Sequence, residues 1–403
     1  MFYYVSFLRP PPSQALPSST VNIVPQIAND LRTELFGDSL DIFYSWYPAG
    51  ETDENSIDTA KPVRLTTWKH TNAYKEINVP LPPGVRDGQS WRLILSSEPQ
   101  HISINFHDAR GAEPKFGKTP FAVISMPINF TKNATKNSKK QEKIERRYSF
   151  IAPRLQNSEN SRVKLTLKII EQTSFDLDKK IWDSGIGLSS WLVSLAGNVD
   201  SSVQESDSAV AQLRRALFSP AARNIIELGA GTGIVALTLG ALRSVLVADE
   251  GEPDDGCLIT TDLPSAMPLL KQNISLNSHN LTRQTACPRP EILDWDADIP
   301  PYTQALRGKL DAIIMADVTY NTASFPALIR TLSRLIKLNS IDRPPMILLG
   351  YKERDVAERT LWTMATEIGV HFELAGERPG AGGAPVEVWI GQIGRPAKGM
   401  VYS

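Results

Sequence analysis

The sequence predicts an α/β fold, in which a Rossmann-like sheet of about seven strands follows a smaller N-terminal domain of mostly β or α+β structure. Two patterns support this prediction. From Ile225 onward, short apolar runs of strand length alternate with longer helical stretches, as in a doubly wound parallel sheet. Residues 1–130 instead contain short candidate strands separated by turns rich in Pro and Gly.

Length and composition limit the possible functions. At 403 residues the chain has room for two domains, and we expect a polar, basic linker at residues 131–160 and a second domain at 161–403. The 43 basic and 44 acidic residues give a net charge of −1, which argues against a general polyanion binder. Two cysteines exclude a disulfide scaffold, and no apolar stretch is long enough for a membrane span. We expect a soluble protein located in the cytoplasm, with the nucleus as a second candidate location.

The N-terminal domain contains no evident group of reactive residues. Its candidate strands are Asp41–Tyr47, Pro62–Trp68, Glu76–Leu81, Trp91–Ser96, Ile102–His107 and Phe121–Ile128, with one short amphipathic helix at Val24–Phe36. His101 and His107 would lie about 20 Å apart along an extended strand, too far to share a metal ion. With no matching cysteines nearby, we expect no metal site.

Residues 131–160 are rich in Lys, Arg, Asn and Ser, and two interpretations are open. The basic residues could contact nucleic acid or an acidic partner. They could also lie in a solvated linker, which we favour because no stacking aromatic residues are interleaved with them.

The most informative stretch is a short apolar strand that runs into a glycine-rich turn. Gly229, Gly231 and Gly233 form the turn, but Ile234 stands where the dinucleotide fingerprint requires its last glycine. Glu227 precedes the turn, and a carboxylate there is unfavourable for a pyrophosphate at a helix N-terminus. A ligand with a positive amine and a sulfonium suits that carboxylate, which points to S-adenosylmethionine.

Further elements follow in regular alternation. Expected strands are Arg162–Ile170, Ser244–Asp249, Cys257–Asp262, Glu291–Leu293, Leu310–Ala316, Met346–Tyr351, Phe372–Leu374 and Val386–Ile390, the last two as an antiparallel pair. Expected helices are the latter part of 180–192, Ala209–Phe218, Ile234–Leu242, Ser265–Ser278, Phe325–Lys337 and Val356–Ile368.

A doubly wound sheet binds its ligand at the carboxyl ends of its strands. An acid at the end of the second strand can accept both ribose hydroxyls of a nucleoside, and both Asp249 and Asp262 are candidates. Asp249 has the conventional spacing of about 20 residues from the first glycine. We prefer Asp262 because it leads directly into a helix. Trp295 could provide an apolar wall for adenine or could be an ordinary core residue.

Another strand end carries Ala316-Asp317-Val318-Thr319-Tyr320. A carboxylate followed three residues later by a tyrosine places an acceptor and an aromatic ring at one pocket mouth. A methyltransferase can use these groups to orient an amine and to stabilise the developing cation.

The chain resembles methyltransferase family 16. The matching motifs are Trp182-Asp183 before a helix, Glu227-Leu-Gly-Ala-Gly-Thr-Gly233, Thr261-Asp262-Leu263, Leu293-Asp294-Trp295 and Ala316-Asp317-Val318-Thr319-Tyr320. This resemblance implies a class I, seven-strand methyltransferase fold over residues 162–393. It also implies a protein-lysine methyltransferase, acting on a chaperone, an AAA ATPase or a translation factor.

The resemblance further implies how the site is divided. Trp182, Glu227, Gly229, Ala230, Gly231, Asp262, Trp295 and Ala316 would bind S-adenosyl-L-methionine, whereas Asp317 and Tyr320 would be catalytic. We expect direct in-line transfer to the amine, without a metal or a covalent enzyme intermediate. The longer segment Arg243–Gly256 and the larger N-terminal domain depart from the family pattern.

Three alternatives remain open. A nucleic-acid amino-methyltransferase would typically have prolines where Val318 and Thr319 stand, and the balanced net charge argues against a nucleic-acid partner. A small-molecule N-methyltransferase and a non-catalytic binding module that kept the fold are the other two.

Overall fold

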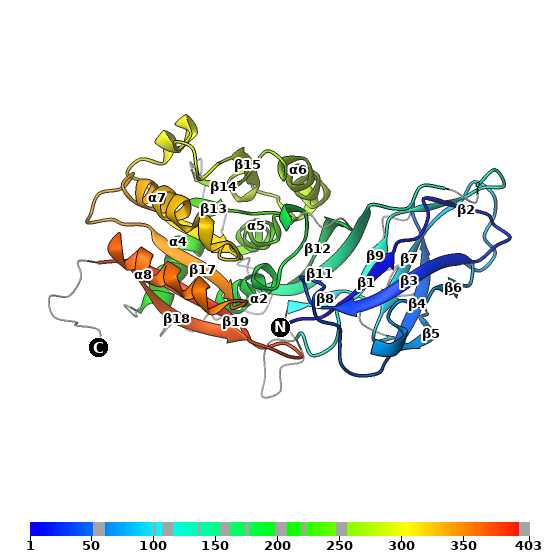
Figure 1. Cartoon of the computed structure of the whole chain (residues 1–403). Coiled ribbons are helices and arrows are strands. Elements are labelled where there is room, and N and C mark those ends of the chain that lie inside the picture. Colours follow the sequence, from blue (N-terminus) through cyan, green and yellow to red (C-terminus); the bar gives the residue numbers. More distant parts are fainter. Residues whose placement is uncertain are drawn as a thin grey trace. The chain divides into compact units, whose positions relative to one another are not determined.

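A computed structural model of the chain describes residues 1–50, 61–99, 102–106, 116–135, 138–153, 162–173, 177–197, 208–219, 223–246 and 256–394. The chain divides into two compact units (Figure 1). Unit 1 contains residues 1–149, 166–181 and 379–383, and unit 2 contains residues 150–165, 182–378 and 384–403. No helix in the described ranges is long and apolar enough to cross a membrane.

Unit 2 is built on a seven-stranded sheet with the order β15-β14-β13-β16-β17-β19-β18. Its strands are β13 (Asn224–Leu228), β14 (Cys257–Asp262), β15 (Pro288–Ile292), β16 (Leu310–Ala316), β17 (Met346–Lys352), β18 (Val370–Arg378) and β19 (Val386–Ile393). The first five are mutually parallel, and β19 runs antiparallel to both β17 and β18. This order confirms the predicted seven-stranded α/β sheet.

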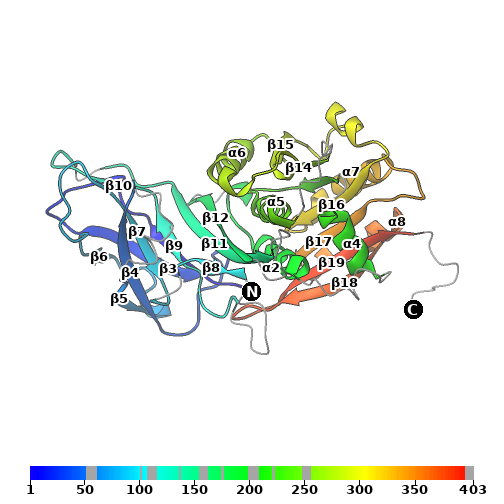
Figure 2. The ribbon, with the colours of Figure 1, turned by 180° about the vertical axis from the view of Figure 1, so that it is seen from behind.

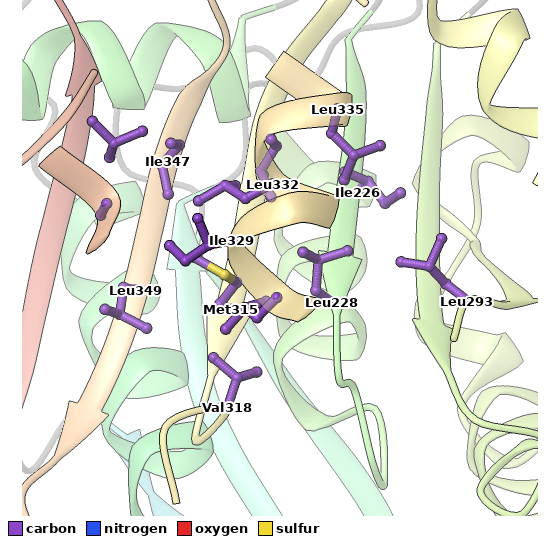
Figure 3. Packing of buried hydrophobic residues seen from close by; sticks show 14 of the residues in the cluster. Ile226, Leu228, Leu293, Met315, Val318, Ile329, Leu332, Leu335, Ile347 and Leu349 are labelled. Atoms are coloured by element: carbon purple, nitrogen blue, oxygen red, sulfur yellow. The ribbon is translucent and has the colours of Figure 1, made fainter. Parts of the chain in front are cut away.

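Helices cover both faces of this sheet. They are α2 (Asp183–Gly197), α4 (Ala209–Phe218), α5 (Ile234–Leu246), α6 (Met267–Leu276), α7 (Phe325–Ile336) and α8 (Thr360–Glu367). On one face, α2 and α5 pack against each other, and α4 lies next to β16 when the sheet is seen from behind (Figure 2). On the other face, α7 and α8 share a core with alternate residues of β13, β16 and β17, among them Met315 and Leu349 (Figure 3).

The position of α2 depends on the lack of a side chain at Gly350 in β17. A Cβ atom at this residue would lie 3.0 Å from Cβ of Leu188 and 3.1 Å from the carbonyl oxygen of Ser184. Both contacts are tighter than ordinary van der Waals packing, so a larger residue here would require the start of α2 to shift away from β17. The N-terminus of α2 is thereby fixed beside the carboxyl ends of β16 and β17.

The predicted strand at Ser244–Asp249 is wrong where the structure describes it. Residues 244–246 form the last turn of α5, and Asp249 lies outside the described residues. The apolar run Val245-Leu246 resembles a strand, but the buried Arg243 hydrogen-bonds the carbonyl of Leu217 and fixes this turn as helix.

Unit 1 is rich in β structure, as predicted. Its strands are β1 (Tyr4–Arg9), β2 (Gln14–Ala15), β3 (Val21–Ala28), β4 (Leu40–Pro48), β5 (Val63–Trp68), β6 (Ile77–Val79), β7 (Ser90–Ser96), β8 (Ile104–Asn105), β9 (Val123–Ser125) and β10 (Ile128–Phe130). β1, β3 and β6 form a three-stranded sheet. The others belong to a nine-stranded sheet that also contains β11 (Lys143–Pro153) and β12 (Arg162–Gln172).

The predicted helix at Val24–Phe36 is wrong. Residues 21–28 form β3, which pairs antiparallel with β1 and also with β6. Because nearly every residue of β3 is buried, its apolar residues do not alternate with polar ones, and the period of a half-exposed strand is absent.

The predicted solvated linker at 131–160 is wrong for residues 143–153, which form β11. Nε of Arg146 lies 2.8 Å from Oε1 of Glu171 in β12, and its Nη1 donates to three backbone carbonyls, including that of Ala122 at 2.7 Å. Arg147 pairs with Glu145 at 2.8 Å. All four charged residues of these two pairs are buried, so this part of the basic run neutralises acids inside unit 1.

The Arg146–Glu171 pair gives a stability prediction. We expect Glu171→Gln to lower the free energy of unfolding by about 3 kcal/mol, because it leaves a buried guanidinium without its counter-charge. Urea denaturation would measure the change. Glu142→Gln is the matched control, because its pair with Lys139 is solvent-exposed and should contribute little. Equal effects of the two substitutions would contradict this role for the buried pair.

Candidate functional site

The glycine-rich turn between β13 and α5 has left-handed backbone geometry at three positions. The φ angles of Gly229, Gly231 and Gly233 are 67°, 54° and 83°. The turn is closed by a 2.8 Å hydrogen bond from the Gly233 amide to the carbonyl of Ala230. The Ala230 amide donates to the carbonyl of Thr261 at 3.0 Å, which ties the turn to β14. Side chains with a Cβ atom are strained in this conformation, so the glycines are required by the backbone itself.

Trp295 and Val318 lie against this turn. A Cβ atom at Gly229 would be 3.0 Å from Cγ1 of Val318 and 3.4 Å from Cζ2 of Trp295. The structure therefore brings together residues from the ends of β13, β15 and β16 that the sequence separates widely. Trp295 is half-buried and also packs on the core beneath α7.

Asp262, at the end of β14, joins the same turn. Its Oδ2 accepts a 2.6 Å hydrogen bond from the Gly231 amide, and its Oδ1 accepts a 2.7 Å bond from the amide of Leu263. Asp262 is therefore an acid in direct contact with the glycine turn, whereas Asp249 lies outside the described residues. Leu263 is 44% exposed directly beside this carboxylate, and the sequence analysis did not select it.

Glu227 lies beneath the turn and is only 2% exposed. Its Oε2 accepts a 2.6 Å hydrogen bond from the hydroxyl of Thr260 in the neighbouring strand. Burial raises the pKa of this carboxyl to about 7, the Thr260 hydrogen bond opposes the shift, and the charge of Asp262 adds to it. The group is therefore held in a balance between its neutral and charged forms near neutral pH.

Asp317 follows β16 and connects three segments. Its Oδ2 accepts a 2.6 Å hydrogen bond from the amide of Ser184 in the first turn of α2. Its Oδ1 lies 2.6 Å from Nη1 of Arg354, which follows β17. Asp317 also has a φ of 56°, a left-handed conformation that is unusual for a residue other than Gly. Such strain persists where the surroundings hold the residue firmly, as these two partners do.

Trp182 and Tyr320 form an aromatic pair at this end of the sheet. Their ring planes are 4° from parallel, with centroids 6.2 Å apart. The guanidinium carbon of Arg354 lies 5.2 Å from the centroid of the Trp182 ring. Tyr320 is 50% exposed, and Ala316, at the end of β16, pairs with Gly350 of β17. Trp182, Asp317 and Tyr320 therefore belong to one contact network, with Arg354 as its fourth member.

Comparison with known proteins identifies the family. A family model described as lysine methyltransferase matches residues 161–368. The chain belongs to the lysine methyltransferase family. Among curated relatives, the protein-lysine N-methyltransferase EFM6 of Saccharomyces cerevisiae is 32% identical over 141 residues, covering 34% of this chain and 52% of EFM6. EEF1A lysine methyltransferase 3 of Xenopus tropicalis is 34% identical over 113 residues, covering 28% of this chain and 42% of that protein.

The match thus spans about half the length of the curated relatives. Solved structures with detectable likeness include Aeropyrum pernix fibrillarin in complex with S-adenosyl-L-methionine. It is 13% identical, with a TM-score of 0.30, and the match covers 43% of this chain and 68% of that one.

Sequence reasoning assigned no role to four residues of this candidate site: Ser184, Leu263, Val318 and Arg354. Arg354 follows β17 directly after Lys352-Glu353, and a charged residue at the carboxyl end of a parallel strand is the sequence signal that marks it. Ser184 acts through its backbone amide, which no sequence pattern distinguishes. Leu263 and Val318 are apolar residues adjoining predicted acids, and their positions become informative only once the strands are aligned.

The buried Glu227 gives a prediction on pH and stability. Its folded-state pKa of about 7 lies above the usual 4.5, so its contribution to stability is full below pH 4.5 and is lost as the pH rises through 7. We expect the unfolding free energy of wild type, relative to Glu227→Gln, to fall by up to about 3 kcal/mol across this range. Urea titrations at several pH values would measure it. A difference that is independent of pH would contradict the assigned protonation.

Proposed function

We propose that the protein is an S-adenosylmethionine-dependent N-methyltransferase that methylates a lysine side chain of another protein. Family membership and the names of the relatives support the activity. The observation that carries the proposal is that two sets of residues lie next to each other at the carboxyl ends of the parallel strands. The glycine turn, with Asp262 and Trp295, lies at the ends of β13 to β15. The Asp317 and Tyr320 pair follows the adjacent β16.

The residues around the turn fit this cofactor. The missing Cβ at Gly229 lets the backbone of the turn lie close to the Trp295 indole. The carboxylate of Asp262, which accepts from the Gly231 amide, would also receive the ribose hydroxyls. We propose that Trp182, Glu227, Gly229, Ala230, Gly231, Asp262, Trp295 and Ala316 hold the cofactor. When bound, the cofactor supplies an electrophilic methyl group on a sulfonium.

The protein's own contribution is to position the acceptor amine. Asp317 is fixed by two hydrogen bonds, so its location relative to the strand ends does not fluctuate as a free side chain would. The Trp182 and Tyr320 rings can stabilise the positive charge that develops on the amine nitrogen. Positioning of this kind lowers the barrier by removing the entropy cost of bringing the reactants together.

Exposed apolar residues next to the site support a macromolecular acceptor. Tyr320, after β16, is 50% exposed, and Val356, after the adjacent β17, is 79% exposed. Large side chains exposed around a reaction centre suit contact with the surface of a substrate protein. We propose that this rim contacts the substrate, and that the substrate belongs to the chaperone, AAA ATPase or translation-factor classes, with the reaction taking place in the cytoplasm or nucleus.

The cofactor assignment is tested by calorimetry with S-adenosylmethionine. We expect Asp262→Ala to weaken binding by about tenfold or more, since it removes a charged acceptor that also orders the glycine turn. Val356→Asp, at the exposed rim, is the control and should bind the cofactor as wild type does. Unchanged affinity in Asp262→Ala would exclude Asp262 from the cofactor site.

The substrate class is tested by incubating the protein with methyl-labelled S-adenosylmethionine and a cell lysate. We expect label in a discrete protein band and none with Asp262→Ala. With the band purified as substrate, Val356→Asp should raise KM several-fold and leave kcat near wild type, because the new charge disfavours docking only. Label confined to RNA or metabolites would refute a protein substrate, and no label in any fraction would favour a non-catalytic binding module.

A further inference from the structure

The charge on Asp317 is already compensated within the protein. One carboxylate oxygen faces Nη1 of Arg354 at 2.6 Å, and the other faces the backbone amide of Ser184 at 2.6 Å. Ser184 lies in the first turn of α2, where the helix dipole adds a partial positive charge. The side chains of Asp317 and Arg354 are only 5% and 12% exposed, so solvent screens their pair weakly.

Arg354 is itself fixed by several contacts. Its guanidinium carbon lies 5.2 Å from the centroid of the Trp182 ring, and its Nη1 is 3.4 Å from the carbonyl oxygen of Lys352. Its backbone amide donates to Oε2 of Glu358 at 3.3 Å. A single side chain thus contacts both the proposed catalytic acid and the ring that stacks with Tyr320.

The chemistry of lysine methylation requires a neutral amine, whereas a free lysine has a pKa of about 10.4. A buried carboxylate without a partner would favour the ammonium form and raise that pKa further, whereas a nearby guanidinium opposes the effect. We propose that Arg354 is a positioning residue that cancels the charge of Asp317, so that the acceptor lysine loses its proton on entering the site. The N–H bond of the ammonium breaks, the electron pair stays on nitrogen and the proton passes to water.

Other charged groups near this network do not replace Arg354. Glu358, behind Arg354, is buried, and burial is the main cause that raises the pKa of its carboxyl. Asp183, in the first turn of α2, and Lys352, at the end of β17, are also buried. Tyr351 stays protonated because burial raises the pKa of its phenol. Arg359, whose guanidinium carbon lies 4.6 Å from the centroid of the Tyr351 ring, is paired with Glu353 and Glu387. With Arg354 removed, the carboxylate of Asp317 would lose the guanidinium that faces it.

This inference rests on the proposed function. Its test uses the full chain as enzyme and, as substrate, the protein that wild type labels in the lysate. The pH dependence of kcat at saturating substrate reports ionisations in the enzyme–substrate complex. We expect Arg354→Met to move the midpoint of the rise in kcat upward by about one pH unit or more. Its rate near pH 7 should then fall about tenfold, and the high-pH plateau should largely recover. Arg354→Lys keeps the charge and should keep a midpoint close to wild type.

The controls separate the two proposals. Calorimetric affinity for S-adenosylhomocysteine, near wild type in both variants, would establish that they fold and bind the cofactor. An Arg354→Met variant whose rate falls equally at every pH would overturn the charge-cancelling role and leave the proposed function intact. Absence of label transfer by wild type would overturn the proposed function, and with it the role of Arg354 toward a lysine amine.

Discussion

The ion pair between Asp317 and Arg354 holds the candidate catalytic end of the sheet together. Asp317 follows β16, Arg354 follows β17, and the Ser184 amide belongs to α2 on one face of the sheet. Each of these segments ends or begins at this point. The orientation of Trp182, and of Tyr320 beside it, is linked to the same contact through the guanidinium of Arg354.

The α/β part of the fold was predictable because its elements are local and strongly patterned. The strand at Leu310–Ala316 and the helix at Ala209–Phe218 agree with the sequence prediction residue for residue. The length and the spacing of the apolar residues in each segment fit only one type of secondary structure, and polar residues mark where each segment ends. The end of α5 was not predictable, because its last turn depends on the burial of Arg243 against a distant carbonyl.

The structure of unit 1 was less predictable from the sequence, because its charged residues and its strands pair with partners that are distant in the sequence. Arg146 and Glu171 each look like a surface residue in isolation, and only the pairing in the folded unit makes burial of both possible. The same holds for the site. Asp262 and Asp317 could be selected as acids at strand ends, but their partners, Gly231, Ser184 and Arg354, could not be assigned without the register of the strands.

Gly350 has no functional group, yet it sets the separation between β17 and α2 on which the Ser184 hydrogen bond to Asp317 depends. A single added methyl group would meet the carbonyl of Ser184 in the turn that supplies this bond. The restriction that this position places on the site is therefore geometric. Transplanting the site onto another parallel sheet would likewise require this narrow helix-to-strand spacing, together with the charged residues themselves.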